Sequence, residues 1–388
     1  MNRIRVLQIS SGFAVEGPSG GLGRFAMELS RKLDQTRVEP ILCGLWDHGT
    51  ELEQQRLRQL EQEGVEAFTA VPFSESVPYQ RFWDAYRAIR SHMAGRSVDV
   101  LHSHEQFGDV MALLLGPTLK PRAVVRTVHN EREWARRPLR RVFLTGLLYP
   151  LAFKLEVGVS QQVVDNLNAR WFARLLNRRA VRIYNSLNLD RFTFSGVPYT
   201  DVRHELGIND GAVVLCSVGR LTAQKGYEIL IDAMRGVVTQ FPSVFLIVVG
   251  DGVLREALLG QVKRLGLDKN ILFLGQRSDI ECILSTSDLF VSSSLWEGLP
   301  TVIIESMAAG VPVIATDVSG TRELVSDEVT GYLVKPGDAE ALQGKILYAI
   351  ENIARTDSVV ERARTRVGEM FSIENAADQY INLYLDVI

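Results

Sequence analysis

The stretch that decides the fold is SLWEGLPTVIIESMAAGVPVIATDVSG, Ser294 to Gly320. An apolar strand precedes it. The loop then leads through Pro300 into a helix, because proline suits a first helical turn where no amide donor is needed. Gly310 predicts the left-handed end of this helix, and Pro312 prevents its continuation. Val313 to Ala315 is typical of the next buried strand. This order of strand, helix and strand predicts a parallel α/β sheet.

Two carboxylates flank the start of this helix. Glu297 lies in the loop, and Glu305 lies about one turn inside the helix. The free amides around Leu299 to Val302 form a positive helix end that suits phosphate, so Glu305 is placed to bind a sugar hydroxyl beside it. Glu297 is placed to meet a second sugar. Such glutamates are more often solvated surface charges, but the apolar residues of the helix argue against free exposure here.

The segment resembles the E-x7-E motif of retaining nucleotide-sugar glycosyltransferases with the GT-B fold, the large family 4 group. Glu297 and Glu305 match the two glutamates. The resemblance implies that the first contacts the donor sugar and that the second holds the nucleotide ribose. It also implies donor contacts from the residues after the first glutamate, which are Gly298, Leu299, Pro300 and Thr301.

Length and composition predict an ordinary core-forming protein of two domains. The chain has 388 residues, of which 46% are hydrophobic and 23% charged. Its longest neutral, mostly apolar run, Val142 to Phe153, is too short to span a bilayer. Met1 leads directly into a strand, so we expect no secretory signal. A reducing cytoplasm is the expected location because the cysteines are scattered; they are Cys43, Cys216 and Cys282.

The net charge of −3 hides an asymmetry. Residues 1–190 hold 26 Lys+Arg and 20 Asp+Glu, whereas residues 191–388 hold 17 and 26. A basic first half and an acidic second half suit two domains with different partners. We expect no nucleic-acid partner.

The first half opens with strand Ile4 to Ile9 and a glycine-rich loop, Ser10 to Gly23. Gly20 and Gly21 let the backbone approach a ligand at the start of a helix expected from about Arg24. The loop is no G-x-G-x-x-G, so a dinucleotide fingerprint is a poor match. A flexible surface loop is the alternative, whereas the resemblance implies that Gly20 and Gly21 cap the donor phosphate from the opposite domain.

Histidines follow two strands of this half. Val98 to His102 is the first strand, and His104 comes just after it. No third metal ligand lies nearby, so packing is favoured for His102 and a place in the acceptor cleft for His104. The strand Ala123 to Val128 leads into His129 at the strand end where open parallel sheets bind ligands. The resemblance implies that His129 is the family's active-site histidine, which contacts the donor sugar.

Arg132 to Phe153 combines five arginines with an apolar run. Such a stretch can lie on an anionic membrane with its arginines at the headgroups. The alternative is a helix that packs on the sheet and carries an arginine-rich outer face. Both interpretations stay open, and with them a peripheral location at the inner face of the plasma membrane.

The motif IYNSLNLDRF, Ile183 to Phe192, also resembles the family. A linker near Ser195 to Pro198 follows it, and the second half then begins a new series of strands and helices. A buried strand, Val213 to Val218, is followed by Arg220 and Lys225 before a helix from about Tyr227. Two cations at a strand end beside a helix start form a good diphosphate clamp. They match the family's G-R-x-x-x-x-K-G, in which they stabilise the leaving nucleoside diphosphate.

Two further turns and the last helix extend the resemblance. Gly250 matches a glycine turn of the donor site after the strand Phe245 to Val249. The resemblance implies that the turn containing Arg277 lies against the nucleotide base, largely through backbone contacts. The final helix, Ile373 to Tyr384, resembles the helix that crosses back onto the first domain.

These observations predict an α/β protein with two Rossmann-like, doubly wound domains facing across a cleft, the GT-B fold. The expected domains are 1–190, joined by the helix 372–388, and 191–371. The predicted reaction transfers a hexosyl-type sugar from a nucleoside diphosphate sugar to an acceptor hydroxyl, and the resemblance implies retention. Glu297, His129, Arg220 and Lys225 are its expected catalytic residues. The sequence has no D-x-D triad, so we predict neither a metal nor a cofactor.

Other functions remain as alternatives. A nucleotide-sugar epimerase of the same fold would convert the donor without an acceptor, and a non-catalytic protein would only bind it. The cation pair followed by E-x7-E favours transfer. A nicotinamide-dependent oxidoreductase is disfavoured because G-x-G-x-x-G follows neither first strand. Sugar, base and acceptor cannot be read from the sequence; polysaccharide, lipopolysaccharide or glycolipid assembly is the general expectation.

Overall fold

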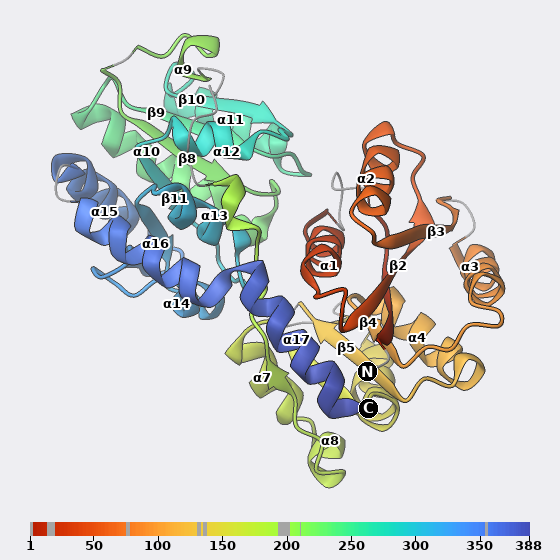
Figure 1. Cartoon of the computed structure of the whole chain (residues 1–388). Helices are drawn as coiled ribbons and strands as arrows, with labels where there is room; N and C mark the ends of the chain where they lie inside the picture. Colours follow the sequence, from red (N-terminus) through yellow and green to blue (C-terminus); the bar gives the residue numbers. More distant parts are fainter. Residues whose placement is uncertain are drawn as a thin grey trace. The chain divides into compact units, whose positions relative to one another are not determined.

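The computed structural model of the chain describes residues 3–13, 20–74, 78–129, 133–134, 138–192, 202–209, 211–353 and 356–388. It divides into two compact units (Figure 1). Unit 1 comprises Met1–Asn188 and Ile373–Ile388, and unit 2 comprises Leu189–Ser372. The expected linker Ser195 to Pro198 lies outside the described residues.

Unit 1 is built on a parallel sheet. Within the described residues it has seven strands in the order β3-β2-β1-β4-β5-β6-β7, a doubly wound order that grows outward from β1 on both sides. The strands are β1 (Ile4–Ser10), β2 (Val38–Asp47), β3 (Glu66–Pro72), β4 (Val100–Ser103), β5 (Ala123–Val128), β6 (Leu155–Gly158) and β7 (Val181–Arg182).

Helices cover both faces of this sheet because its strands are apolar on both sides. Val6 packs with Phe25 of α1 and Tyr380 of α17 on one face. Leu7, the next residue of β1, packs with Met111 of α4 on the other. The helices are α1 (Gly20–Lys32), α2 (Glu51–Gln62), α3 (Pro78–His92), α4 (Gln106–Leu119), α5 (Pro138–Arg140), the π-helix η1 (Arg141–Leu148), α6 (Tyr149–Ala152), α7 (Gln161–Asn168), α8 (Trp171–Leu175) and α17 (Ile373–Val387).

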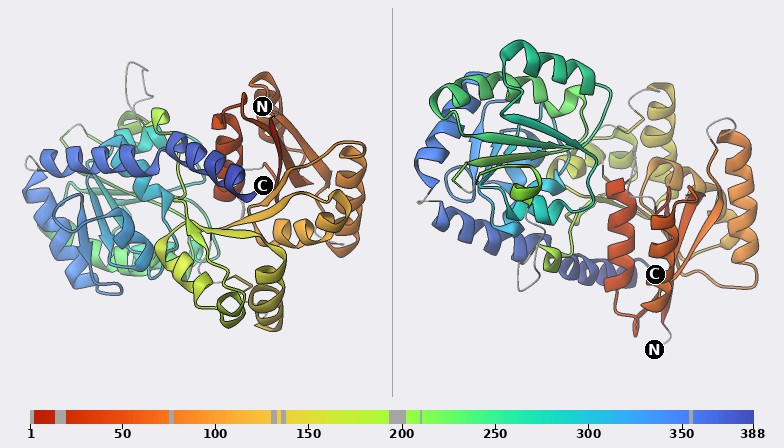
Figure 2. Two further views of the ribbon diagram at one scale, coloured as in Figure 1. Left: turned by 60° about the horizontal axis from the view of Figure 1, so that its bottom comes forward. Right: turned by 90° about the horizontal axis from the view of Figure 1, so that it is seen from above.

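Unit 2 repeats the plan with a parallel sheet in the order β10-β9-β8-β11-β12-β13. Figure 2 shows its strands enclosed by helices. The strands are β8 (Val214–Val218), β9 (Phe245–Val249), β10 (Ile271–Gly275), β11 (Leu289–Ser292), β12 (Val313–Thr316) and β13 (Tyr332–Val334). The helices are η2 (Leu189–Arg191), α9 (Val202–Glu205), η3 (Ala223–Lys225), α10 (Tyr227–Gln240), α11 (Arg255–Leu265), α12 (Ile280–Ser285), α13 (Thr301–Ala309), α14 (Ser319–Leu324), α15 (Ala339–Glu351) and α16 (Asp357–Phe371).

The fold class predicted from the sequence is confirmed: each unit is a Rossmann-like α/β layer structure. The helix expected after Pro300 is α13, and Gly310 ends it in the left-handed conformation with φ 76°. Two expectations in unit 1 differ. Helix α1 begins at Gly20 rather than near Arg24. The helical spacing of Phe82, Trp83 and Tyr86 predicts a core position for Trp83, but its side chain is 53% exposed.

The arginine-rich segment falls partly outside the described residues, as do Arg132, Arg136 and Arg137. Its described part forms α5, η1 and α6. None of the helices in the described ranges is long and apolar enough to cross a membrane.

Candidate active site

Glu297 and Lys225 meet at one edge of the sheet of unit 2. Lys225 Nζ donates to Glu297 Oε1 over 2.5 Å, and Ser294 Oγ donates to the same oxygen over 2.6 Å. Gln224 Nε2 lies 3.4 Å from Glu297 Oε2. Glu297 is 6% exposed, so its carboxylate is fixed in a buried position by one cation and one hydroxyl.

The sheet topology brings the two residues together. Lys225 follows β8 and Glu297 follows β11, and these two strands are parallel neighbours. Their carboxyl ends therefore open at the same edge, where doubly wound sheets bind ligands. Ser293 Oγ donates to the Lys225 carbonyl, and the Leu295 amide donates to that of Gln224. The two loops thus hold each other.

Glycines permit this close packing. Gly226 has φ 62°, and a Cβ there would lie 2.3 Å from the Ser293 carbonyl oxygen. Gly250, after β9, has φ 129°, and its Cβ would lie 2.1 Å from the Gly219 carbonyl oxygen. Both positions therefore require glycine, because a side chain would combine a strained backbone with a clash against a carbonyl oxygen.

Helix α13 begins directly beyond Glu297. Pro300 is its N-cap residue and provides no side-chain cap, and the Ile303 amide donates to the Pro300 carbonyl over 3.0 Å. The amides of Thr301 and Val302 therefore precede the intrahelical ladder, at the positive end of the helix. Glu305 lies in the next turn and is 5% exposed.

The two other cations predicted for the donor site differ in their surroundings. Arg220 follows β8 and is exposed, and its side chain has no partner among the residues that the structure describes. Arg277 is occupied, because its guanidinium pairs with Glu205 over 2.8 Å and with Asp279 over 2.7 Å. These carboxylates raise the pKa of Arg277. Of these two cations, Arg220 is therefore the one whose guanidinium is open to an added anion.

His129 lies at the corresponding edge of unit 1, directly after β5. It is 8% exposed, and its ring meets Phe25 edge-on at 5.5 Å between centroids. Neither ring nitrogen has a hydrogen-bond partner in the described part of the chain. Burial lowers the pKa of His129 to about 3, so the ring is neutral near pH 7. A buried imidazole that lacks partners is typical of a ligand site.

The two neighbouring histidines are tied into the fold. His102 bonds to Tyr384 Oη over 2.7 Å and to Thr127 Oγ1 over 2.8 Å. Both ring nitrogens are used, which agrees with the packing role favoured from the sequence. His104 bonds through Nε2 to Gln8 over 2.8 Å, while its buried Nδ1 has no partner among the described residues.

A buried ionic cluster supports β5 below His129. Arg126 is fully buried and pairs with Asp109 over 2.8 Å, Glu133 over 2.7 Å and Glu156 over 2.8 Å. Its guanidinium also lies 4.2 Å from the centre of the Tyr149 ring. The cluster joins β5 to α4 and β6, so it fixes the strand that presents His129.

Some residues of the site were missed in the sequence. Ser294 and Gln224 contact Glu297 directly, yet nothing in their type marks them. Only their positions in the sequence could have indicated them, since each lies within three residues of a predicted site residue. Arg126 had a clearer signal, because a charged residue inside the apolar strand AVVRTV requires a buried partner.

The predicted Gly20 and Gly21 form the first residues of α1. The loop residues before them, 14–19, lie outside the described part of the chain. Among the residues that the structure describes, no group of three or more metal-ligating side chains is present.

Comparison with protein families matches both halves of the chain. Residues 199–366 match the family "Glycosyl transferases group 1", and residues 19–191 match "Glycosyltransferase Family 4". The chain is also 30% identical to the phosphatidyl-myo-inositol mannosyltransferase of Mycobacterium tuberculosis over 295 residues, which cover 73% of this chain and 72% of that one.

Another relative matches over a shorter segment. The N-acetyl-alpha-D-glucosaminyl L-malate synthase of Bacillus anthracis is 30% identical over 212 residues, about half of its length, with 55% of each chain covered.

Solved structures share the fold over the whole chain. HepE of Anabaena, determined with UDP and glucose, has a TM-score of 0.80 at 23% identity and covers 99% of this chain and 100% of its own. Sucrose-phosphate synthase of Thermosynechococcus elongatus has a TM-score of 0.81 at 22% identity and covers 99% of each chain. These likenesses establish the GT-B fold alone. Together with the family matches, they show that the chain belongs to glycosyltransferase family 4, among the group 1 glycosyl transferases.

Proposed function

We propose that the protein is a retaining glycosyltransferase that moves a sugar from a nucleoside diphosphate sugar to an acceptor hydroxyl. The observation that carries the proposal is the buried Lys225–Glu297 pair beside the first amides of α13. A cation, an acceptor-only carboxylate and a positive helix end then lie at one sheet edge, where a sugar diphosphate needs all three.

The leaving nucleoside diphosphate is stabilised by positive groups. Lys225 has three N–H donors and uses one on Glu297, so the other two can reach phosphate oxygens. Arg220 provides a second, exposed cation, and the amides of Thr301 and Val302 add the helix dipole. Such preorganised donors act where charge develops as the diphosphate departs. They take the role that a metal ion plays in other enzymes.

The carboxylates orient the donor. Glu297 binds hydroxyls of the donor sugar, and Ser294 and Lys225 fix the direction of its oxygens. Glu305 holds the ribose one turn into α13. In unit 1, His129 is neutral and has one ring N–H and one acceptor nitrogen available for a sugar hydroxyl.

Several similar proteins support a nucleotide-sugar donor and a cell-envelope or polysaccharide product. HepE of Anabaena was determined with UDP-glucose. A galactosyltransferase of Escherichia coli, 29% identical over 210 residues, is described as using UDP-Gal and a diphosphoundecaprenol acceptor. We therefore place this protein in polysaccharide, lipopolysaccharide or glycolipid assembly.

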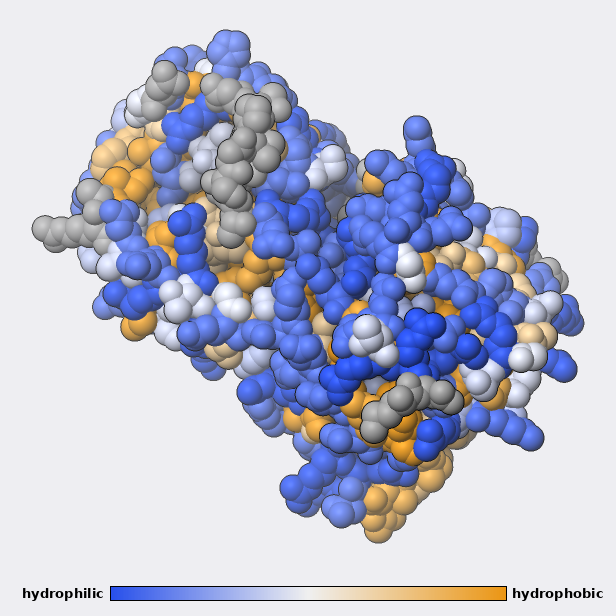
Figure 3. Space-filling model, in the orientation of Figure 1, coloured by the Kyte–Doolittle hydropathy of each residue, from blue (hydrophilic) through white to orange (hydrophobic). Residues whose placement is uncertain are grey.

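We also propose that unit 1 lies on an anionic membrane through the segment Arg132 to Phe153. In its described part, Val142 is 72% and Leu151 is 51% exposed, and the adjoining α8 exposes Trp171 by 67%. Residues 138–182 contain eight Lys and Arg and two Asp and Glu. Figure 3 shows hydrophobic side chains at the end of the unit where Figure 1 draws α8. A vesicle sedimentation assay tests this surface. The protein is expected to sediment with phosphatidylglycerol vesicles and not with phosphatidylcholine vesicles.

The experiment that tests the proposed function follows the fate of the donor. UDP, GDP and ADP sugars are incubated with the protein and a cell-envelope lipid and glycan extract, and the products are resolved by NMR. Release of nucleoside diphosphate with a new glycoside of unchanged anomeric configuration supports retaining transfer. A new nucleotide sugar without that release indicates an epimerase. Binding without either product indicates a non-catalytic protein.

A further inference from the structure

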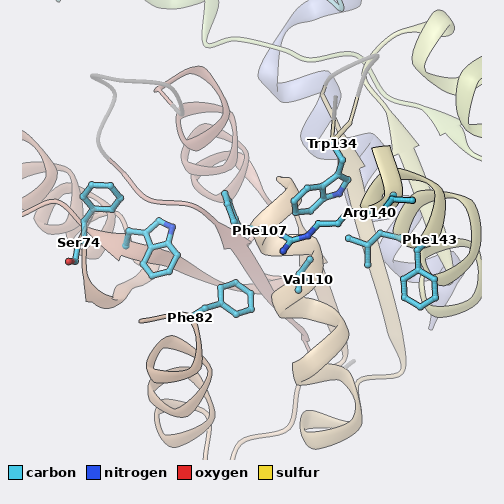
Figure 4. A pocket seen from close by; sticks show the side chains of 11 residues that line it. Ser74, Phe82, Phe107, Val110, Trp134, Arg140 and Phe143 are labelled. Carbon is cyan, nitrogen blue, oxygen red and sulfur yellow. The ribbon is translucent and has the colours of Figure 1, made fainter. Parts of the chain in front are cut away.

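Unit 1 contains an apolar pocket that the donor site does not use. Its cavity measures about 640 Å³ and is lined mainly by aromatic and aliphatic side chains (Figure 4). They include Trp46, Phe73, Phe82, Phe107 and Trp134. This volume lies within the range of pockets that bury a small molecule.

The pocket lies at the ligand-binding edge of the sheet. Trp46 is near the carboxyl end of β2, Phe73 comes directly after β3, and Phe107 is in the first turn of α4, just after β4. Because the carboxyl ends of parallel strands form the binding edge of such sheets, the pocket belongs to the same edge of unit 1 as His129. This position suits a ligand-binding cavity better than a gap left by imperfect packing.

The chemistry of the walls selects the occupant. Among the lining residues, Arg140 is the one charged side chain, and Ser74 is the one other polar side chain. A bare sugar would have to bury its hydroxyls without partners, which is unfavourable. An apolar chain would instead gain from leaving water.

Arg140 adds one positive charge to the otherwise apolar lining of the pocket. In Figure 4 its guanidinium extends toward the middle of the cavity, past Phe107 and Val110. Arg141, the next residue, is exposed at the start of η1. Guanidinium groups bind phosphate through charge-assisted hydrogen bonds. The pocket thus combines an apolar space with one guanidinium group in its lining.

We propose that this pocket binds an amphiphilic acceptor, whose apolar chain fills the aromatic cavity and whose phosphate pairs with Arg140. The inference rests on the proposed function and names its acceptor class: a lipid phosphate that carries the hydroxyl to be glycosylated. The apolar lining continues onto the surface through Leu139 and Phe143, which are 85% and 55% exposed. A chain longer than the cavity can therefore extend along these residues.

Calorimetry with dodecyl phosphate, below the concentration at which it forms micelles, tests the pocket. Phe107 is 51% exposed, so Phe107→Asp changes the lining with little risk to the fold. We expect at least a tenfold loss of affinity, because an aromatic side chain that the ligand's apolar chain would cover is replaced by a charge. Val110→Trp, which fills the cavity, provides an independent second variant. Leu385→Asp is the matched control, since Leu385 is exposed on α17 of the same unit and does not line the pocket.

Two further probes separate the chain from the phosphate. Arg140→Gln is expected to weaken dodecyl phosphate about tenfold and to leave dodecyl glucoside unchanged. Inorganic phosphate alone is expected to bind far more weakly than dodecyl phosphate, because it lacks the chain.

The outcomes are decisive in each direction. Equal losses in Phe107→Asp and Leu385→Asp would assign the amphiphile to a general apolar surface and overturn the pocket. Unchanged binding in Phe107→Asp and Val110→Trp would also overturn it. Nucleoside diphosphate binding, measured on the same samples, reports on unit 2 separately. The proposal of an acceptor pocket can therefore be disproved while the proposal of the donor site is supported, and the reverse is also possible.

Discussion

Lys225 Nζ lies 2.5 Å from Glu297 Oε1, although 72 positions separate the two residues in the sequence. The contact links the loops after β8 and β11, and it buries a carboxylate against a cation at the edge where ligands bind. A pair in this place is held ready for a donor because each partner retains free hydrogen-bonding capacity: two N–H groups on Lys225 and several lone pairs on Glu297.

Removal of the Ser294 hydroxyl should impair orientation of the donor sugar. Ser294 Oγ donates to Glu297 over 2.6 Å, and a hydrogen bond to a charged group contributes about 1.5–3 kcal/mol. Ser294→Ala is therefore expected to lower kcat roughly tenfold or more, with a smaller change in the Kd of the nucleoside diphosphate. Steady-state kinetics measure the first and calorimetry the second. Ser285→Ala, at an exposed hydroxyl of unit 2, is the control; equal kcat values in both variants would contradict the role of Ser294.

Transfer should continue in EDTA, because the cations of the protein are proposed to stabilise the leaving group. Arg220→Ala should then lower kcat by about 10²-fold, the typical effect of removing one donor from a developing anion. Activity that is lost in EDTA and restored by Mg²⁺ would disprove the metal-independent mechanism.

Stability of unit 1 should fall as the solution becomes acidic. Burial lowers the pKa of His102 to about 3, so the folded form stays neutral while the unfolded chain takes up a proton near pH 6.5. Since the unfolded state binds more protons between these values, the free energy of unfolding decreases as pH falls from about 6.5 toward 3, by roughly 1 kcal/mol per pH unit for each such histidine. His104 and His129 act in the same direction.

Urea unfolding at several pH values, in wild type and His102→Gln, measures this effect. The variant is expected to be less stable at pH 7, because His102 loses its bonds to Tyr384 and Thr127. Its free energy of unfolding should also decrease less than that of wild type between pH 7 and pH 5. This comparison uses the unfolding transition that the substitution shifts. Parallel declines in the two proteins would refute the assignment of a buried neutral His102.

The cluster around Arg126 should be a major determinant of stability. Arg126→Met leaves buried carboxylates without their cation and is expected to destabilise the protein by about 3–5 kcal/mol. Addition of Asp109→Asn should have less than its separate effect, because the two residues are in contact. Arg87→Met, at a 77% exposed side chain, should change stability by less than about 0.5 kcal/mol. Denaturant unfolding compares Arg126→Met, Asp109→Asn, the double variant and Arg87→Met; similar losses in Arg87→Met and Arg126→Met would contradict this account.

The sequence predicted the parts of the fold that local signals determine. Strand β5 was predicted with its observed bounds, and Gly310 ends α13 in the left-handed conformation as expected. Strand ends place Lys225, Glu297 and His129 at binding edges because parallel strands open their carboxyl ends together. These features follow from periodicity and from glycine and proline alone.

Contacts between distant segments could not be predicted in the same way. No sequence pattern showed that Lys225 would bind Glu297, that Ser294 would orient it, or that Arg126 would gather three carboxylates. The exposure of Trp83 was missed because helical spacing cannot tell which face of α3 packs on the sheet. The apolar pocket near Trp46 depends on four separate segments and has no signature in any one of them.

The measurement that tests the central claim most directly is calorimetric titration of UDP, GDP and ADP, without added metal, into wild type, Lys225→Ala and Lys263→Ala. Lys263 is an exposed lysine of α11 in the same unit and serves as the matched control. We predict that one nucleoside diphosphate binds wild type and Lys263→Ala equally and that Lys225→Ala weakens it by at least tenfold, as expected for loss of a charge-assisted contact to phosphate. Binding that is absent from all three proteins, or equal in all three, would contradict a donor site built on Lys225 and Glu297.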